Sequence, residues 1–204
     1  MNGCLIIIGA RAMGREACIY ARDAGYEVKG FLDSNPVALD EYDGYPAILG
    51  SVENYQPKAE DRFVVALGDP RLKLHYANMI VQKNGVFTSI IHPSSYIGSN
   101  VIIGEGAIIC PRVTITIDSV LGKHVIVNTG TSINHDNIIG DGTTICPGCL
   151  LAGRVQIGRG VFLGVGSVLI PDVKLGDYVF VAAGATVTKS YQSGRLMGVP
   201  AVCK

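Results

Sequence analysis

An unbroken period of six organises the hydrophobic positions in the second half of the chain. Every sixth residue from Ile91 to Val187 is Ile, Leu or Val. The residue two places before each of them is nearly always small or β-branched, and the residue after it is often Gly or Asn. A helix would show a period of 3.6 residues and a half-buried strand a period of two. The period of six is instead the hexapeptide signature of a parallel β-helix.

In such a fold each flat side points one large aliphatic and one small residue inward and then turns a corner. Three sides make a coil of about 18 residues, and stacked coils pair their backbones about 4.8 Å apart. The ladder is long enough for about five coils, and residues 18 apart should lie directly above one another. We expect the Gly and Asn residues that follow the aliphatics to supply the positive φ of a tight corner.

The first 90 residues lack this ladder and show alternating strands and helices, which predicts a small Rossmann-like parallel sheet. The expected strands are Cys4–Ile8, Val28–Leu32, 62–67 and 86–90, and the expected helices are 13–24 and 70–83. We therefore predict two domains, an α/β domain over residues 1–90 and a β-helix domain with a C-terminal tail over residues 91–204.

Three loops should meet at the carboxyl edge of this sheet, where ligands of α/β folds bind. Their candidate binding residues are Gly9, Ala10, Arg11, Asp33, Ser34 and Gly68. The first loop opens a helix, so its amides could receive a phosphate. Its glycine pattern is G-x-x-x-x-G, which favours a mononucleotide-sized ligand over NAD. In the alternative interpretation, Gly9 and Gly14 only allow close packing of helix and strand.

The composition narrows the function. The 17 basic and 17 acidic residues balance, which removes the electrostatic reason to expect nucleic acid or an anionic membrane as partner. No apolar run reaches the roughly 20 residues of a membrane span, and the start does not read as a signal peptide. The six cysteines show no disulfide-framework spacing. We expect a cytoplasmic protein with free thiols.

Only four histidines are present, and one of them stands out. His135 falls two places after the inward Ile133, so it should point outward at a corner. Asp136 could orient its imidazole. Gly153 follows 18 residues later and should present a bare backbone amide about 5 Å from His135. A base beside an open amide donor suits acyl transfer, in which an oxyanion develops on a carbonyl. The alternative is an ordinary solvated surface histidine.

The whole chain resembles one family, the NeuD/PglD-type hexapeptide sugar acyltransferases. The segments that carry the resemblance are Ile91-His92-Pro93-Ser94, Asn128-Thr129-Gly130-Thr131-Ser132-Ile133-Asn134-His135-Asp136 and Gly198-Val199-Pro200-Ala201. The resemblance implies a left-handed β-helix that forms a homotrimer with active sites between subunits. It implies acetyl-CoA as co-substrate, no metal, and a nucleotide-linked amino sugar held by the N-terminal domain.

The resemblance also implies roles for individual residues. His135 would be the general base, Asp136 would hold its tautomer, and the Gly153 amide would lie beside the thioester carbonyl. Asn128 would contact substrate, although its place after a ladder residue gives it an equally good structural explanation. The groove for acetyl-CoA would be formed by Gly164, Val165, Ala183, Val199 and Pro200.

Two departures concern the acceptor. Family members that act on UDP-4-amino sugars often carry a second histidine nine residues after the first, where this chain has Thr144, and a histidine in the glycine loop, where it has Met13. Thr144 could still offer a hydroxyl to the acetyl group. We expect N-acetylation of a nucleotide-linked, UDP-4-amino sugar for bacterial surface polysaccharide. The alternatives are O-acetylation of sialic acid or another sugar hydroxyl, and a non-enzymatic scaffold that binds a nucleotide sugar.

Two other chemistries fit the sequence poorly. Cys146-Pro147-Gly148-Cys149 has C-x-x-C spacing, but no second pair or suitable histidine accompanies it, and Cys149 falls in the inward column. A zinc-dependent carbonic anhydrase also uses this solenoid. Here His124 and His135 are 11 residues apart and should lie on different sides of the coil.

Overall fold

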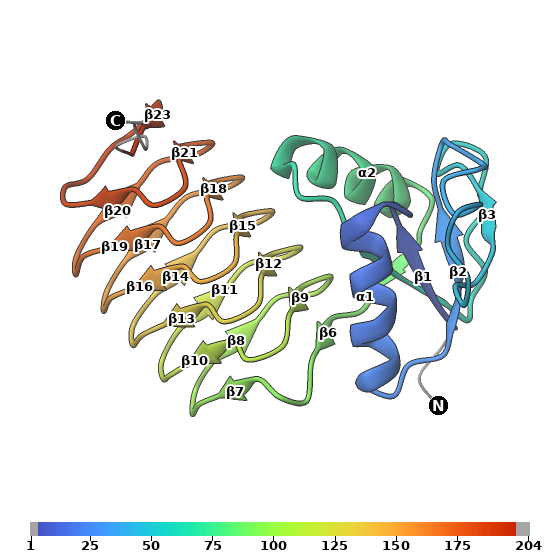
Figure 1. Cartoon of the computed structure of the whole chain (residues 1–204), viewed down its shortest axis with the longest axis horizontal. Helices are drawn as coiled ribbons and strands as arrows, with labels where there is room; N and C mark the ends of the chain where they lie inside the picture. The colour runs from blue at the N-terminus through green and yellow to red at the C-terminus, as the bar shows by residue number, and fades with distance from the viewer. Residues whose placement is uncertain (1–3, 199–204) are drawn as a thin grey trace, which may run out of the picture.

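The structure, a computed structural model, describes residues 4–198 and begins with a five-stranded parallel sheet (Figure 1). Its strands are β1 (Cys4–Ile8), β2 (Val28–Leu32), β3 (Ile48–Gly50), β4 (Asp61–Val65) and β5 (Val86–Phe87), in the spatial order β3-β2-β1-β4-β5. Its helices are α1 (Ala12–Asp23) and α2 (Pro70–Gln82). The predicted α/β fold of this part is confirmed.

Alternation along β1 divides the sheet into two packed faces. Leu5 and Ile7 join the cluster that includes buried residues of α1, whereas Ile6 and Ile8 join the cluster that includes buried residues of α2. Successive side chains of a strand point to opposite faces, so a strand covered by a helix on each face is hydrophobic throughout.

The sequence prediction missed one strand and misplaced another. β3 is only three residues long, and it pairs with the end of β2. The strand predicted over 86–90 is two strands, because β5 pairs with β4 while β6 (Ile90–Ile91) pairs with β9 of the solenoid. Pairing of the solenoid type therefore begins at Ile90.

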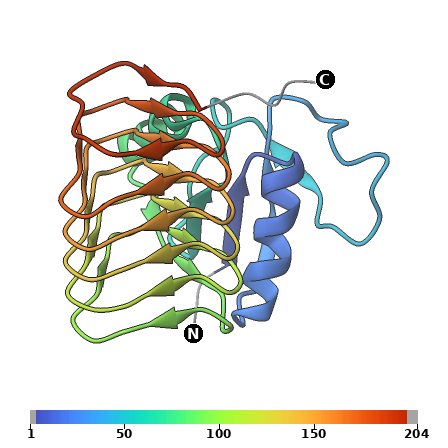
Figure 2. The same ribbon diagram turned by 60° about the vertical axis from the view of Figure 1, so that its left-hand side comes forward.

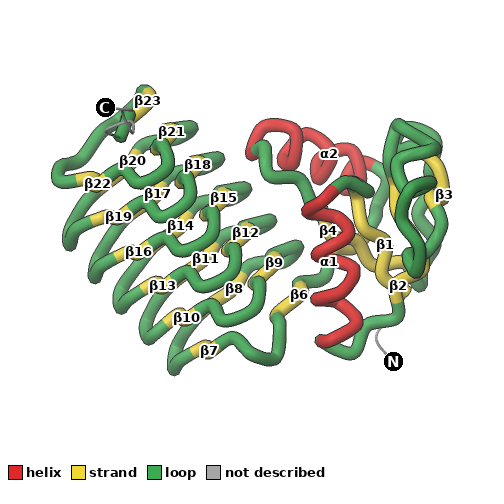
Figure 3. Tube along the Cα trace, viewed as in Figure 1, coloured by secondary structure: helices red, strands yellow, loops and turns green. Residues whose placement is uncertain are grey.

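The rest of the chain is a parallel β-solenoid with three faces, built from very short strands joined by loops (Figure 3). The first face contains β6, β9 (Ile108–Ile109), β12 (Ile126–Val127), β15 (Thr144–Ile145), β18 (Phe162–Leu163), β21 (Phe180–Val181) and β23 (Arg195–Leu196). The second contains β7 (Tyr96–Ile97), β10 (Thr114–Ile115), β13 (Ser132–Ile133), β16 (Leu150–Leu151), β19 (Val168–Leu169) and β22 (Thr186–Val187). The third contains β8 (Ile102–Ile103), β11 (Val120–Leu121), β14 (Ile138–Ile139), β17 (Gln156–Ile157) and β20 (Lys174–Leu175).

Stacking follows the predicted register of 18 residues. Thr114 pairs with Ser132, and Ser132 pairs in turn with Leu150. From Ile109 to Val187 the ladder aliphatics are buried, as Ile133 and Leu163 illustrate with no exposed surface. Figure 2 shows the coils stacked above one another. The predicted β-helix is confirmed, while its left-handed sense stays a prediction.

The glycines that follow the ladder aliphatics were expected to supply positive φ, and this explanation was wrong. The left-handed backbone occurs three residues after each ladder position from Ile97 to Val181, and several of those residues are not glycine, for example His124 (φ 57°), Asp136 (φ 59°) and Arg154 (φ 60°). The glycines directly after the ladder lie on the neighbouring coil instead. A Cβ at Gly140 would come within 2.5 Å of the carbonyl carbon of Gly158. These positions need glycine for lack of space, not for positive φ.

One hydrophobic core runs from the α/β part into the solenoid. The cluster that contains Ala17 and Cys18 of α1 continues through Ile90 and Ile108 into the ladder. α1 contacts β6, the first strand of the solenoid, as Figure 1 shows. α2 lies against the solenoid farther along, where Leu74 fills the space that a side chain at Gly142 would need.

The two glycine classes predict different responses to asparagine. Gly140→Asn places a Cβ against the next coil and should lower the free energy of unfolding by about 1–3 kcal/mol, the usual cost of overpacking. Gly148→Asn should be close to neutral, because Gly148 has φ 68° with open space around it, and Asn tolerates that conformation. Urea unfolding of both variants checks this. Equal tolerance at the two positions would contradict the packing explanation.

Candidate functional site

The turn between β13 and β14 carries the predicted histidine. His135 Nδ1 lies 2.6 Å from Asp136 Oδ2, and the His135 side chain is 46% exposed, so it points outward as predicted. Because a carboxylate only accepts hydrogen bonds, this contact places a proton on Nδ1. In the neutral imidazole, Nε2 then has a free lone pair and can accept a proton.

Gly153 occupies the next coil directly beside this imidazole. A Cβ built on Gly153 would lie 2.5 Å from His135 Nε2, a contact that no real side chain could make. Backbone pairing holds the two coils together, since Asn134 N–H donates to Leu151 O and Arg154 N–H donates to His135 O. The predicted juxtaposition of His135 and Gly153 is therefore present.

A buried asparagine, which the sequence analysis did not single out, supports the histidine turn from inside. Asn137 has no exposed surface. Its Nδ2 lies 2.7 Å from Asn134 O, 3.3 Å from His135 O and 3.0 Å from Ala152 O. The amide thus holds the turn that carries His135 and ties it to the coil of Gly153. The signal in the sequence was an amide side chain at a position, two residues before a ladder aliphatic, that small or β-branched residues otherwise occupy.

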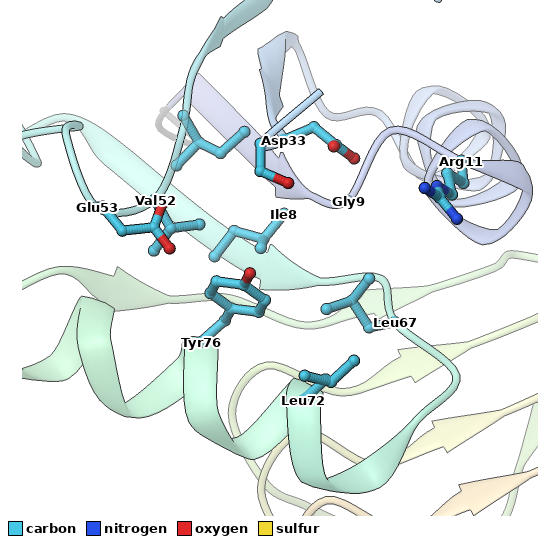
Figure 4. Close-up of a pocket in the computed structure, with 11 residues that line it drawn as sticks. Ile8, Gly9, Arg11, Asp33, Val52, Glu53, Leu67, Leu72 and Tyr76 are labelled. Atoms are coloured by element: carbon cyan, nitrogen blue, oxygen red, sulfur yellow. The ribbon is translucent and has the colours of Figure 1, made fainter. Parts of the chain in front are cut away.

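The α/β part contains a cavity of about 280 Å³ at the carboxyl edge of its sheet (Figure 4). Its lining consists of Ile8, Gly9, Arg11, Leu32, Asp33, Ser34, Val52, Glu53, Leu67, Leu72 and Tyr76. Four of the predicted binding residues are among them. Of the other two, Ala10 takes part through its backbone amide, and Gly68 is not in the lining, although its neighbour Leu67 is.

Asp33 braces the loops of this cavity. Its Oδ2 accepts from Ala10 N–H at 2.8 Å and its Oδ1 from Asn35 N–H at 2.9 Å. The close-packing explanation of the glycines also holds, because a Cβ at Gly14 would overlap the carbonyl of Gly9, and Gly9 itself has φ 96°. Tight helix packing and a ligand cavity thus share this loop.

Two arginines, Arg11 and Arg15, lie where α1 begins, and Asp40 and Glu41 line the same shallow pocket. Arg11 is the N-cap residue, and no acidic residue lies in the first turn. The Arg15 guanidinium lies 3.5 Å from the centre of the Tyr42 ring. The free N–H groups and the dipole of a helix N-terminus favour anions, so this end of the cavity can hold phosphate.

Two predicted site residues have other contacts in the structure. Asn128 Nδ2 donates to Ile145 O at 2.8 Å, which supports its structural explanation. Thr144 is almost fully buried on the first face, where its hydroxyl accepts from Lys73 Nζ at 2.7 Å. It lies away from His135 of the same chain, and its assignment as an acetyl contact stays a prediction.

The predicted groove residues gather at a different corner of the solenoid. Gly164 lies against the backbone of Ala183, where a Cβ would come within 2.5 Å of the Ala183 N, and Val165 beside them is 54% exposed. This corner joins the first and second faces, whereas His135 lies where the second and third faces meet. Val199 and Pro200 lie outside the described residues.

Lys73 is the unexpected polar group of the molecule. It is fully buried between α2 and the first face and donates to Thr143 O at 3.2 Å and to Thr144. Burial lowers its pKa to about 7. His124 is also buried near α2, edge-on to Phe87, and burial lowers its pKa to about 4.

The part of the chain that the structure describes, residues 4–198, offers neither a metal site nor a membrane-spanning helix. In this range no three His, Cys, Asp or Glu side chains are grouped so that they could hold a metal ion. Neither α1 nor α2 is long and apolar enough to cross a membrane.

Comparisons with known proteins match both parts of the chain. Residues 4–80 match the family described as PglD N-terminal domain, and residues 154–189 match the family described as bacterial transferase hexapeptide (six repeats). None of the curated protein sequences compared with the chain matches it.

Solved structures match over the full length. PerB from Caulobacter crescentus, in complex with CoA and GDP-perosamine, is 31% identical with a TM-score of 0.89, covering 100% of this chain and 98% of PerB. The acetyltransferase domain of PglB from Neisseria gonorrhoeae is 26% identical with a TM-score of 0.87, covering 97% of each chain. WeeI from Acinetobacter baumannii shares the fold at 23% identity, with a TM-score of 0.84 and 96% of each chain covered.

The buried Lys73 predicts a specific pH dependence of stability. The folded protein releases the Lys73 proton at about pH 7, while the unfolded chain holds it to near the ordinary value of 10.5. Between these values the unfolded state binds more protons, so this group makes stability rise with pH. Lys73→Met should remove up to about 1.4 kcal/mol per pH unit of that rise between about pH 7 and about pH 9.

The measurement is a series of urea unfolding curves across this pH range. Lys58→Met, at an exposed position, is the matched control and should keep the wild-type slope. Burial raises the pKa of the Cys146 thiol to about 11. Above about pH 9 this group therefore lowers the free energy of unfolding as pH rises, which opposes the effect of Lys73. If the free energy of unfolding changes with pH equally in the wild type and in Lys73→Met, the lowered pKa of Lys73 is wrong.

Proposed function

The chain belongs to the NeuD/PglD-type family of hexapeptide-repeat sugar acetyltransferases, and from this premise we propose that it moves the acetyl group of acetyl-CoA to the amine of a nucleotide-linked sugar. The enzyme class, an acetyl-CoA-dependent sugar acetyltransferase, follows from the family. The amine, the nucleotide and the residue roles are the proposal. The observation that carries it is the Asp136–His135 pair stacked beside Gly153.

In the proposed reaction the sugar amine attacks the thioester carbonyl directly. As the C–N bond forms, His135 Nε2 takes a proton from the nitrogen, and Asp136 stabilises the imidazolium through Nδ1–H. The carbonyl oxygen becomes an oxyanion, which the Gly153 N–H would stabilise. Cleavage of the C–S bond releases CoA as a thiolate, and the proton on His135 neutralises it. Atoms and charges balance without a covalent enzyme intermediate.

The arrangement of the solenoid supports a site shared between subunits. The exposed residues Val165 and Ala183, with the buried Gly164 beside them, suit the thin apolar pantetheine arm, but they lie at a different corner from His135. A second copy of the chain could bring its own groove beside His135. We therefore propose a homotrimer with acetyl-CoA between neighbouring subunits.

The α/β part would hold the acceptor. A nucleotide base fits the largely apolar cavity at the edge of the sheet, and its phosphates fit the end near Arg11 and the start of α1. We propose that residues 1–90 bind the nucleotide sugar and residues 91–204 carry out transfer, in the cytoplasm, for surface polysaccharide synthesis.

The test is thiol release from acetyl-CoA with a panel of UDP-, GDP- and dTDP-linked amino sugars and free sialic acid. The wild type should turn over one amino sugar, and His135→Ala should be slower by about 10²–10⁴-fold, the usual value of a general base. Turnover on sialic acid alone would mean O-acetylation. Binding of nucleotide sugar with no turnover of any acceptor would favour the scaffold.

Gly153 offers a second test of the same geometry. Gly153→Ala places a methyl group where the imidazole lies, so the rate constant should fall by at least about tenfold through loss of base geometry. In a His135→Ala background the ring is gone, and Gly153→Ala should add little further loss. The measurement is the rate constant of the wild type, the two single variants and the double variant, which together form a double-mutant cycle. Independent, additive losses would contradict the contact.

A further inference from the structure

The cavity of the α/β part has two chemically different ends (Figure 4). Arg11 lies at one end, where α1 begins. Val52 and Glu53 lie at the other, with Leu72 and Tyr76 of α2 along one wall. If phosphates lie near Arg11, as proposed above, the base extends between apolar walls toward Glu53.

Glu53 is held in place by a lysine at the end of α2. Lys83 Nζ donates to the carbonyls of Val52 at 2.7 Å, Glu53 at 2.6 Å and Tyr55 at 3.0 Å. Three carbonyl contacts from one ammonium fix the backbone of this segment. Hydrogen bonds from its own backbone N–H and from the Ser51 hydroxyl lower the pKa of Glu53, so the carboxylate is ionised at neutral pH.

We propose that Glu53 reads the nucleotide base and that this base is guanine, an inference that rests on the proposed function. A carboxylate only accepts hydrogen bonds. Guanine presents two adjacent donors, its ring N1–H and its exocyclic 2-amino group, which match the two oxygens of one carboxylate. Uracil and thymine present a single N–H between two carbonyls that would repel the carboxylate. Adenine and cytosine offer only one exocyclic amine.

The other carboxylate of the cavity is placed differently. Asp33 lies near the start of α1, where its oxygens accept the backbone N–H groups of Ala10 and Asn35. Glu53 lies at the opposite end of the cavity (Figure 4), so its position makes it the carboxylate that faces the base. This assignment replaces the UDP sugar expected from the sequence, and it agrees with the GDP sugar bound to PerB, which is 31% identical.

Calorimetry with GDP, inosine diphosphate and UDP on the full-length protein tests the inference. Inosine diphosphate differs from GDP only in lacking the 2-amino group. The wild type should bind GDP at least about tenfold more tightly than inosine diphosphate or UDP, the range of one hydrogen bond to a charged group. Glu53→Gln should lose most of both preferences, while UDP affinity stays within about threefold.

Glu60→Gln is the matched control, because it removes a carboxylate at an exposed position that does not line the cavity, and it should keep the wild-type preferences. Equal affinity for GDP and inosine diphosphate, or tighter binding of UDP, would overturn the base assignment and leave the nucleotide cavity in place. If none of the three nucleotides binds, both the guanine assignment and the nucleotide cavity fall.

Discussion

Backbone pairing between residues 18 apart is the constraint on which the solenoid depends. It sets the vertical distance between coils, so that each side chain meets the residues one coil above and below it. The same register that stacks Ile115 on Ile133 in the core brings His135 beside Gly153 on the surface. A repeat that exists for packing thus also sets the geometry of the site, and the sequence needs only a histidine and a missing side chain at matching positions.

The regular part of the structure could be read from the sequence because periodic contacts depend only on sequence separation. The ladder, the outward direction of His135 and its neighbour Gly153 follow from counting. The positions with left-handed backbone could not be predicted from residue type, because Asp136 and Arg154 adopt φ near 60° although they are not glycine. A turn that every coil repeats is imposed by the fold on whatever residue occupies it.

Contacts between the two parts of the chain were beyond prediction, since no periodicity relates them. Lys73 and Thr144 are 71 residues apart and meet only because α2 lies on the first face. Glu53 was missed because it follows a three-residue strand too short to recognise, and Lys83, which holds its loop, lies 30 residues away. The lining of the cavity depends on such non-local contacts, so its specificity emerges only in three dimensions.

The shared hydrophobic core gives the α/β part a structural role in addition to the ligand binding proposed for it. α1 packs on the outer side of the first face, with Ala17 and Cys18 in the same cluster as Ile90 and Ile108, and it stands beside the stacked coils in Figure 2. The outward positions Ile90 and Ile108 have no exposed surface, whereas the corresponding residues of the other two faces of the first coil, Tyr96 and Ile102, are exposed. Exchange of the α/β part between related proteins therefore requires redesign of the outer side of the first face as well. If the cavity binds the acceptor as proposed, natural variation in recognition should be concentrated in the cavity loops, away from the face of α1 that packs on the solenoid.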